Sequence, residues 1–484
     1  MSKLFRPAAA LMFTFILLAP LAGLAAQRRR TPVDLIVAGG TVVTMDDQRR
    51  VIEDGAVAVS KGRIVAVGTR AEVERRHALA PRGQRIDASG KVVLPGLVNG
   101  HTHVPMTLFR GLADDLDLNE WLTKYIFPAE AKNVTEDFVR VGTRLGLAEM
   151  IRGGTTTYCD MYYFEDAIAE ETARAGVRGV LGETVIDFPV ADNKTWAEAM
   201  AYSERYLRRW KGHALVTAAV APHAPYTVSE EHLKEVRRLA DRTDSTVVIH
   251  LSETRKEVDD ITAQKGVPPA EYLERIGFFR GRVVAAHTVH LNEREIGLMK
   301  ERGVGCVHNP QSNMKLASGV APVPRMLAAG VSVGLGTDGA ASNNDLSMWE
   351  EMDTAAKLHK LASNDPKAVS AEQALEMATV GGARALHMER DIGSLEQGKR
   401  ADLVVVDLDE LHQTPLYNVY SHLVYATKAS DVRHVVIEGR VVMRDRRLLT
   451  IDEADVKRRA RVYRERVRQS LAALRREGGP AGGR

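Results

Sequence analysis

The stretch Leu94-Pro-Gly-Leu-Val-Asn-Gly-His101-Thr-His103 joins a short apolar run to two histidines that are two residues apart. Residues at that spacing on an extended segment face the same way, so both imidazoles can reach one ion. The plain alternative is a pair of surface histidines, which the preceding Pro-Gly and apolar run disfavour. The stretch therefore predicts a strand whose end delivers ligands, as the strands of a parallel barrel do.

Three later apolar runs also end in a group that can bind metal or move a proton. His250 ends the run from residue 247 and Glu253 follows it, His287 ends the run from residue 283, and Asp338 comes after the run from residue 331. A satisfied core histidine is the alternative for His250 taken alone. Together with the first pair, the pattern predicts one metal site, with His250 as a candidate ligand and Glu253 as a proton carrier.

Three imidazoles and one carboxylate suit a zinc ion that keeps one position open for water, although another divalent metal would also fit such donors. Water bound in that position becomes hydroxide near neutral pH. A second metal would usually need a bridging ligand from the middle strands. The fourth apolar run, residues 214–221, leads to Pro222-His223 and contains no lysine. We therefore expect a single metal ion.

Short apolar runs alternate with helix-like segments between residues 94 and 385. About eight such repeats predict an α/β fold, a (β/α)8 TIM-like barrel. Short strands and glycine turns fill residues 33–93 and return at 390–447, which predicts a small β-sandwich domain built from both chain ends. Residues 452–476 have an apolar stripe on a basic helix, and packing on the body is a better interpretation than membrane or partner binding.

The composition is that of an ordinary soluble enzyme, with 45% hydrophobic and 27% charged residues among 484. A net charge of +3 gives no global field that would attract nucleic acid, so we expect a small-molecule substrate and no nucleic-acid partner. Two cysteines, Cys159 and Cys306, exclude a disulfide framework. Each lies in or beside an apolar run, where packing is a better interpretation than a nucleophilic or ligand role.

Residues 1–26 have the pattern of a signal peptide, with Lys3 and Arg6, an apolar stretch over residues 8–18, and small residues before Gln27. We therefore expect an exported protein, periplasmic or secreted. One alternative is an uncleaved membrane anchor, because apolar residues continue almost to residue 26. A cytoplasmic protein is the other, because the three arginines at residues 28–30 would slow translocation.

These features resemble the amidohydrolase superfamily, and within it the branch of 5-methylthioadenosine/S-adenosylhomocysteine deaminases and their chlorohydrolase relatives. The resemblance covers nearly everything after residue 33. It is highly specific for the branch and much less so for the substrate. Besides the ligands, it rests on these motifs: His103-Val-Pro-Met-Thr-Leu-Phe-Arg-Gly111, Trp121-Leu with Phe127-Pro-Ala-Glu130, Ala221-Pro-His-Ala-Pro-Tyr226, His308-Asn-Pro-Gln-Ser-Asn313 and Gly336-Thr-Asp-Gly-Ala-Ala-Ser-Asn343.

The resemblance implies a role for each site residue. Zinc would be bound by three imidazoles and a carboxylate, those of His101, His103, His250 and Asp338. Asp338 would be the base on the zinc-bound water, and Glu253 would pass a proton to the ring nitrogen from a dry site. His287 would hold the attacking hydroxide or the developing alkoxide. The family also implies a homo-oligomer.

The resemblance further implies three substrate contacts. Glu130 would bind ribose hydroxyls, His223 would contact the sugar, and Ser342 would line the pocket. The alternatives are a surface carboxylate for Glu130 and capping or turn roles for His223 and Ser342.

The implied reaction is hydrolytic deamination of an adenosine derivative: 5′-methylthioadenosine, adenosine, 5′-deoxyadenosine or S-adenosylhomocysteine. Hydroxide attacks an electron-poor ring carbon, an acid protonates the ring nitrogen, and the amine leaves as ammonia. The nearest alternative is a hydrolase on the same scaffold that acts on a guanine-like base, a triazine or a cyclic amide. A non-catalytic binding protein is a remote alternative, which the complete set of ligands disfavours.

One position departs from the family pattern. Members that act on S-adenosylhomocysteine place an arginine after the third strand to hold the amino-acid carboxylate, where this chain has Gly182-Glu183. We expect Glu183 to repel that carboxylate, which would favour 5′-methylthioadenosine, adenosine or 5′-deoxyadenosine as the substrate.

Overall fold

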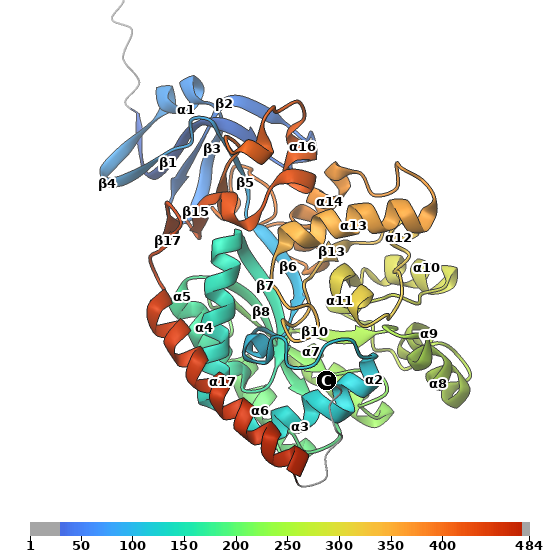
Figure 1. Cartoon of the computed structure of the whole chain (residues 1–484). Helices are drawn as coiled ribbons and strands as arrows, with labels where there is room; N and C mark the ends of the chain where they lie inside the picture. The colour runs from blue at the N-terminus through green and yellow to red at the C-terminus, as the bar shows by residue number, and fades with distance from the viewer. Residues whose placement is uncertain (1–29, 477–484) are drawn as a thin grey trace, which may run out of the picture.

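The computed structural model describes residues 30–476, which form an eight-stranded parallel barrel and a nine-stranded mixed sheet (Figure 1). The predicted fold is therefore confirmed. The signal peptide or anchor predicted at residues 1–26 lies outside the described residues. Within residues 30–476, no helix has both the length and the apolar character that crossing a membrane requires.

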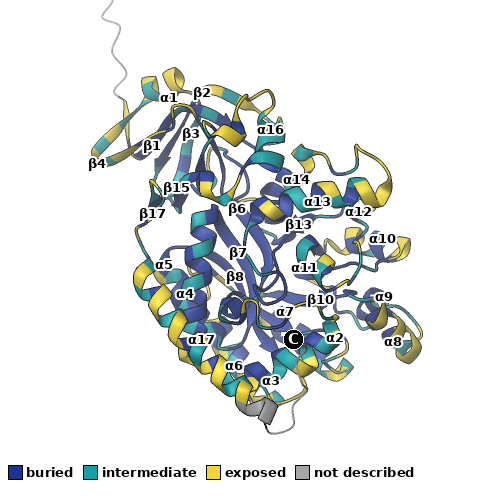
Figure 2. Ribbon diagram, in the orientation of Figure 1, coloured by how far each residue is buried: buried dark blue, intermediate teal, exposed yellow. Residues whose placement is uncertain are grey.

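Every hydrogen-bonded pair of neighbouring barrel strands is parallel, in sequence order from β6 to β13. Most of these strand residues are buried, because alternate side chains fill the interior and the others meet the surrounding helices (Figure 2). The strands are β6 (Leu97–Thr102), β7 (Thr155–Tyr162), β8 (Arg178–Val185), β9 (Val216–Pro222), β10 (Thr246–Leu251), β11 (Val283–His287), β12 (Gly305–His308) and β13 (Val333–Leu335).

Helices between the strands and after the last one cover the outside of the barrel. Their ends follow local signals: Thr195 and Glu198 form a capping box at the start of α6, and Gly154 takes a left-handed conformation after α4. The helices are α4 (Glu136–Gly153), α5 (Glu165–Ala175), α6 (Trp196–Arg209), α7 (Glu230–Thr243), α8 (Arg255–Lys265), α9 (Pro269–Arg275), α10 (Glu293–Arg302), α11 (Pro310–Lys315), α12 (Val323–Ala329), α13 (Met348–Ser363), α14 (Ala371–Met377) and α15 (Val380–Ala385).

The barrel closes where the segment after β13 meets β6. Asp338 N donates to His101 O at 2.9 Å, and Thr337 N donates to the Asn99 side chain at 3.1 Å. Gly336 is required at this seam, since a Cβ there would lie 2.5 Å from Asn309 Oδ1 and 2.7 Å from His101 N. Closure thus brings two of the predicted metal ligands side by side.

The mixed sheet combines strands from both chain ends, in the order β17-β16-β15-β14-β5-β1-β2-β3, with β4 paired to β1. It curls over an apolar core that includes Leu35, Val57 and Leu403, so that Gly62 between β2 and β3 contacts Gly439 between β15 and β16. Its strands are β1 (Thr31–Val43), β2 (Val51–Ser60), β3 (Arg63–Thr69), β4 (His77–Asp87), β5 (Lys91–Pro95), β14 (Leu403–Asp407), β15 (Val432–Ile437), β16 (Arg440–Arg444) and β17 (Arg447–Leu448).

Short helical elements accompany this sheet and follow β6. Beside the sheet lie α1 (Arg70–Arg76), the 3-10 turns η3 (Leu411–Gln413) and η5 (Ala429–Asp431), α16 (Val419–Ser421) and the π-helix η4 (His422–Ala426). After β6 comes the 3-10 helix η1 (Val104–Phe109), followed by α2 (Leu118–Glu120), the π-helix η2 (Trp121–Ile126) and α3 (Phe127–Asn133). We call residues 118–133 the mouth segment, because its side chains line the cavities described below.

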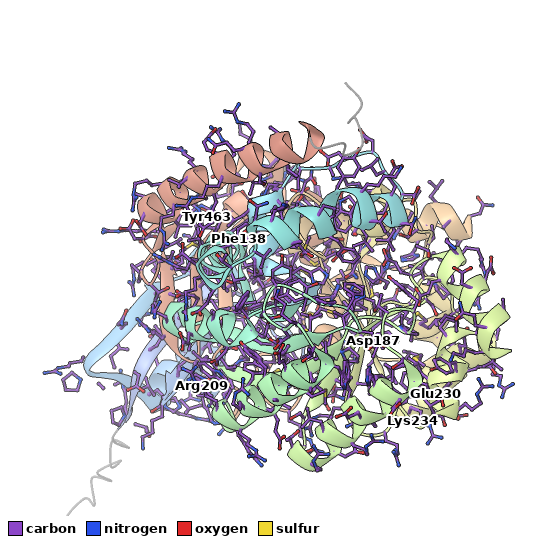
Figure 3. The ribbon with its side chains drawn as sticks, turned by 90° about the horizontal axis from the view of Figure 1, so that it is seen from below. Phe138, Asp187, Arg209, Glu230, Lys234 and Tyr463 are labelled. Atoms are coloured by element: carbon purple, nitrogen blue, oxygen red, sulfur yellow. The ribbon has the colours of Figure 1, made fainter. Side chains whose placement is uncertain are left out.

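The C-terminal helix α17 (Glu453–Arg476) runs along α4 and reaches the mouth segment. The Tyr463 ring packs edge-on against Phe138 at 5.4 Å between centroids, and its hydroxyl donates to Asp137 (Figure 3). Near the other end, the hydroxyl of Ser470 and the amide of Asn133 in α3 are hydrogen-bonded at 2.9 Å. The prediction of a helix packed on the body is confirmed.

A buried ion pair joins the barrel to the mixed sheet and gives a first prediction. The Arg178 guanidinium binds Asp402 at 2.8 and 3.1 Å and Glu438 at 2.6 Å, and Arg178 is 3% exposed. Replacing Arg178→Met leaves the Asp402 carboxylate without its cation, so we expect the free energy of unfolding to fall by about 3–5 kcal/mol. Chemical denaturation measures this change.

The matched control is Arg208→Met, which breaks an exposed pair with Glu204 on one helix face. That pair contributes less than about 1 kcal/mol because both side chains remain solvated. Equal losses for the two variants would contradict the structural importance of the buried pair.

Candidate metal centre

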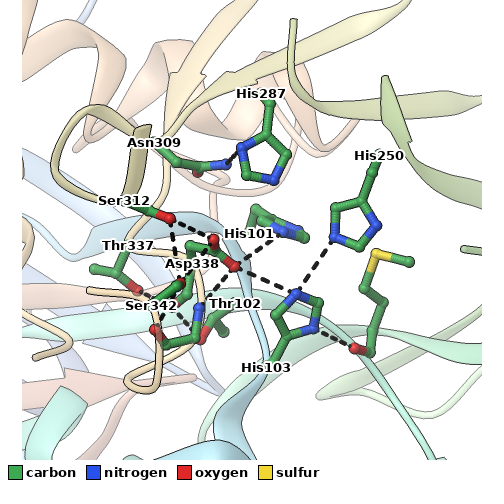
Figure 4. Close-up of polar contacts among 12 residues, drawn as sticks. His101, Thr102, His103, His250, His287, Asn309, Ser312, Thr337, Asp338 and Ser342 are labelled. Atoms are coloured by element: carbon green, nitrogen blue, oxygen red, sulfur yellow. Dashed lines mark hydrogen bonds and ion pairs between the residues drawn. The ribbon is translucent and has the colours of Figure 1, made fainter. Parts of the chain in front are cut away.

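Three histidines and one aspartate converge at the mouth of the barrel (Figure 4). His101 and His250 lie in β6 and β10, His103 directly follows β6, and Asp338 lies in the segment after β13. Asp338 Oδ1 lies 3.5 Å from His101 Nε2 and 3.3 Å from His103 Nε2. His250 Nε2 lies 3.3 Å from His103 Nε2. These are the four predicted ligands, and the structure brings them together.

Their spacing fits a metal ion. Donors about 2.1 Å from an ion in tetrahedral geometry lie about 3.4 Å from one another, as the separations here do. His101 is fully buried and both its ring nitrogens lack a hydrogen-bond partner, which is costly unless an ion accepts a lone pair. His287 borders the same space, since its ring, His101 and His250 offer nitrogens within 4.8 Å of one another. The cluster is a histidine-rich metal-binding site.

Backbone carbonyls orient two of the imidazoles. His103 Nδ1 lies 2.6 Å from Met161 O, and His250 Nδ1 lies 2.8 Å from His223 O. A carbonyl only accepts, so each Nδ1 carries the proton and each Nε2 presents its lone pair to the site.

Asp338 is held by a second set of contacts. Ser312 Oγ and Ser342 Oγ donate to its Oδ2 at 2.7 and 2.9 Å, and Gly339 N donates to Oδ1 at 2.7 Å. Burial opposes ionisation, but the nearby imidazoles of His101 and His103 hold the pKa of Asp338 well below its ordinary value. The carboxylate is therefore ionised and fixed in position.

Glu253 and His287 lie next to the ligands. His287 Nε2 is 3.7 Å from Glu253 Oε2, and its Nδ1 is 2.9 Å from Asn313 Oδ1. Ser318 Oγ donates to Glu253 Oε1 at 3.2 Å. Burial raises the pKa of Glu253, which brings a carboxyl group closer to the range useful for both taking and giving a proton. The expectation of a dry position is confirmed, since Glu253 is 5% exposed.

Two adjoining cavities open beside these groups. They share His103, Trp121, Leu122 and His223. The metal-side cavity is further lined by Leu118, Tyr226, His250, Glu253, His287, Leu316 and Asp338. The far cavity is further lined by Met106, Ile126, Phe127, Glu130, Met161, Tyr162, Tyr163 and Thr184.

Glu130 supplies a second buried carboxyl group, at the far cavity. It is 7% exposed and accepts a hydrogen bond from Tyr162 OH at 2.7 Å. Burial raises its pKa to about 7. The alternative of a surface carboxylate is therefore excluded. His223 lines both cavities, with its Nδ1 3.0 Å from Thr227 Oγ1.

Two sequence expectations differ from the structure. Glu183 was expected to face the substrate, but its side chain points away from the barrel interior and is fully buried. There it accepts hydrogen bonds from Glu165 N and Asn193 Nδ2. Alternation along β8 turns its neighbour Thr184 to the cavity instead. Ser342 was expected to line the pocket, but neither cavity includes it, because its hydroxyl turns back to Asp338.

Sequence reasoning missed several residues of the site. Ser312 and Asn313 lie inside a quoted motif, but nothing in their spacing shows that they support Asp338 and His287. Tyr162 ends strand β7, and its sequence position predicts an aromatic core residue. Only the structure shows its hydrogen bond to Glu130. Cys159 and Cys306 are both free and buried, as expected, and burial raises the pKa of each thiol.

The metal-ligand cluster, together with Glu253 and His287, can activate water and transfer protons. It places an ionised carboxylate, a proton-carrying glutamate and an imidazole around one site for metal, beside two adjoining cavities. Such a set suits metal-assisted hydrolysis at a carbon–nitrogen or carbon–halogen bond.

Comparison with known proteins agrees with this chemistry. A family model described as the amidohydrolase family matches residues 92–442, and a bacterial imidazolonepropionase-like composite domain matches residues 55–80. A 5-methylthioadenosine/S-adenosylhomocysteine deaminase of Syntrophobacter fumaroxidans is 52% identical over 88% of this chain and 97% of its own length.

Solved structures are similar over most of their length. An adenosine deaminase from Xanthomonas campestris with bound zinc has a TM-score of 0.89 and 44% identity, covering 91% of this chain and all of that one. An atrazine chlorohydrolase from Arthrobacter aurescens in complex with zinc has a TM-score of 0.82 and 25% identity, and the match covers 89% of this chain and 99% of that one.

The serine contacts to Asp338 generate a second prediction. In the double variant Ser312→Ala/Ser342→Ala, Oδ2 loses both hydroxyl donors, so we expect metal affinity to fall about 10–100-fold. Competition with a chromophoric chelator measures this affinity. Ser318→Ala is the matched control, because its hydroxyl binds Glu253 and no ligand. Unchanged affinity in the double variant would contradict the assigned role of these serines.

Proposed function

Since this chain belongs to the amidohydrolase family, we propose that it is a metal-dependent hydrolytic deaminase of an adenosine derivative, releasing ammonia and the inosine analogue. One observation carries this proposal: of two adjoining cavities that share four lining residues, one borders the metal site and Glu253 and the other borders the buried carboxyl of Glu130. A nucleoside offers a base for the first cavity and ribose hydroxyls for the second. The 5-methylthioadenosine/S-adenosylhomocysteine deaminases at 42–52% identity support the same substrate class.

We propose that the metal is a single zinc ion held by His101, His103, His250 and Asp338. The donor set of three imidazoles and one carboxylate supports zinc, as does the zinc in the Xanthomonas campestris structure. Another divalent metal would fit the same donors. When bound, zinc lowers the pKa of its water so that hydroxide is available near neutral pH.

The protein groups then carry out the proton transfers. Asp338 accepts a proton from the attacking water, because its carboxylate is ionised and fixed. Glu253 gives a proton to the ring nitrogen as the new carbon–oxygen bond forms, and His287 beside it holds the attacking oxygen. Asp338 then returns the proton it took from water to the exocyclic amine, the carbon–nitrogen bond breaks, and ammonia leaves. The proton of the new hydroxyl group passes to Glu253, which leaves the carbonyl group of the inosine analogue.

Glu130 favours this function over a triazine or guanine-like substrate. A substrate without ribose has no hydroxyls for a carboxyl group at the far cavity, and burying that group is costly without such use. His223, which lines both cavities, lies where the sugar would join the base.

We also propose that the protein is exported and forms a homo-oligomer. Export is supported by the sequence of residues 1–26, and cell fractionation that finds the unprocessed chain in the cytosol would contradict it. Oligomerisation is supported by the family resemblance, which implies a homo-oligomer. A monomer by sedimentation would contradict it.

Ammonia release tests the proposed function. Zinc-loaded protein is incubated with adenosine derivatives, guanine, a triazine and cyclic amides. We expect release from adenosine derivatives, and a loss of about 10²–10⁴-fold in kcat for Glu253→Gln with zinc retained, because the amide transfers no proton. If another compound of the panel is hydrolysed and no nucleoside releases ammonia, metal-dependent hydrolysis stands and the proposed adenosine-derivative substrate is rejected.

The pH dependence of KM tests Glu130. The ionised carboxylate accepts strong hydrogen bonds from the ribose hydroxyls, whereas the protonated form does not. Because burial raises the pKa of Glu130 to about 7, KM for adenosine should rise as the pH falls through about 7. Glu130→Gln should raise KM about 10–100-fold and remove this acid dependence. An acid limb in KM that persists in Glu130→Gln would assign the titration to another group.

A further inference from the structure

The turn between β10 and α8, which carries Glu253, is fixed by a second glutamate, Glu257 in the first turn of α8. Glu257 Oε1 accepts a hydrogen bond from Ser252 N at 2.8 Å, and Glu257 Oε2 accepts one from Glu253 N at 2.8 Å. Ser252 has a left-handed backbone with a φ of 51°, a conformation that serine keeps only where its surroundings hold it. One buried carboxyl group therefore fixes the backbone of Glu253 and of the residue before it.

His290, which follows β11, fixes the same turn and also the carboxyl group of Glu253. Its backbone N donates to Ser252 O at 3.0 Å, and its ring Nε2 donates to Ser318 O at 2.7 Å. Ser318 Oγ in turn donates to Glu253 Oε1 at 3.2 Å. The position of the Glu253 carboxyl group therefore depends on the ring of His290 as well as on Glu257.

Neither Glu257 nor His290 lines either of the two cavities, so neither contacts a substrate bound there. Glu257 is 6% exposed, and burying its carboxyl group is costly unless its hydrogen bonds serve the fold or the site. A proton carrier that is misplaced by about 1 Å can lower the rate about a hundredfold. The contacts of both residues converge on Glu253, whose position decides the proton transfer.

We propose that Glu257 and His290 are positioning residues that hold Glu253 within hydrogen-bond distance of the substrate ring. The proposal rests on the proposed function, in which Glu253 gives its proton to a ring nitrogen. Neither positioning residue transfers a proton itself. Loss of either one therefore slows the proton transfer, while the metal ligands and the substrate contacts remain in place.

The structural alternative is that Glu257 only caps α8, since Thr254 Oγ1 accepts a hydrogen bond from Glu257 N at 3.2 Å. Glu295 offers a matched control, because it occupies the same position in the first turn of α10. Its buried carboxyl group accepts from Asn292 N at 3.0 Å and from Ala270 N at 3.1 Å, and it lies outside both cavities. Replacing Glu295→Gln therefore disturbs a cap of the same kind away from the proton carrier.

The first test measures kcat and KM of zinc-loaded Glu257→Gln and Glu295→Gln with whichever compound of the panel the wild-type protein hydrolyses. An amide offers one accepting oxygen in place of two, so Glu257→Gln loses a backbone contact. We expect its kcat to fall about 10–100-fold with KM and zinc content unchanged, and Glu295→Gln to keep kcat within about twofold. Equal effects on kcat in the two variants would overturn the positioning role. Failure of every nucleoside would reject the proposed function without altering this comparison.

A double variant asks whether Glu257 acts through Glu253. In the Glu253→Gln background no proton is transferred from this position, so its misplacement has nothing further to slow. We therefore expect Glu253→Gln/Glu257→Gln to keep kcat within about threefold of Glu253→Gln alone. A further loss of about tenfold or more would show an effect independent of Glu253 and would contradict the proposal.

His290 gives a second pair of variants. His290→Gln keeps a side-chain N–H that can donate to Ser318 O, whereas His290→Phe retains a ring and removes the donor. We expect kcat to fall about tenfold in His290→Phe, and to stay within about threefold of wild type in His290→Gln. Equal kcat values in the two variants would rule out the ring hydrogen bond as the means of positioning.

Amide hydrogen exchange tests the contacts without a substrate, so its result does not depend on the proposed function. We expect the amide hydrogens of Ser252 and Glu253 to exchange at least about tenfold faster in Glu257→Gln than in the wild-type protein. In Glu295→Gln these two amides should exchange at the wild-type rate. Unchanged exchange in Glu257→Gln would overturn the proposal.

Discussion

The backbone hydrogen bond from Asp338 N to His101 O, 2.9 Å long, joins the segment after the last barrel strand to the first strand and sets the geometry of the metal site. Because both partners are metal ligands, the site exists only when the barrel is closed. Gly336 permits the close approach, and Ser312 and Ser342 fix the carboxylate that emerges from the seam. Closure of the fold and assembly of the ligands are therefore the same event.

Three buried carboxyl groups line the two adjoining cavities and take different roles there. Asp338 stays ionised because histidines surround it, whereas burial raises the pKa of Glu253 and of Glu130. Identical functional groups thereby serve as a base, a proton carrier and a binder of hydroxyls, according to their surroundings. Burying these acids lowers the stability of the fold. A catalytic site explains why they gather at the two cavities, whereas a structural role does not.

The fold and the ligands were predictable from the sequence because both depend on local pattern. His101 and His103 share a face of one strand, and His250 and Asp338 each follow an apolar run, so strand ends alone indicate the convergence. The environment of individual residues was less predictable. Because side chains alternate along β8, a shift of one residue determines whether Thr184 or Glu183 lines the cavity. The turn after Asp338 determines whether the Ser342 hydroxyl contacts the substrate or the Asp338 carboxylate. Long-range partners such as Tyr162 for Glu130 carry no sequence signal of their own.

The most direct test is a crystal structure of the zinc-loaded protein with a nucleoside analogue whose base bears a hydroxyl group on a tetrahedral ring carbon, as in the transition state. We expect the hydroxyl to lie at the metal between Asp338 and His287, the adjacent ring nitrogen to contact Glu253, and the ribose hydroxyls to reach Glu130. A ligand bound in the opposite direction, or one whose ribose does not contact Glu130, would contradict this expectation.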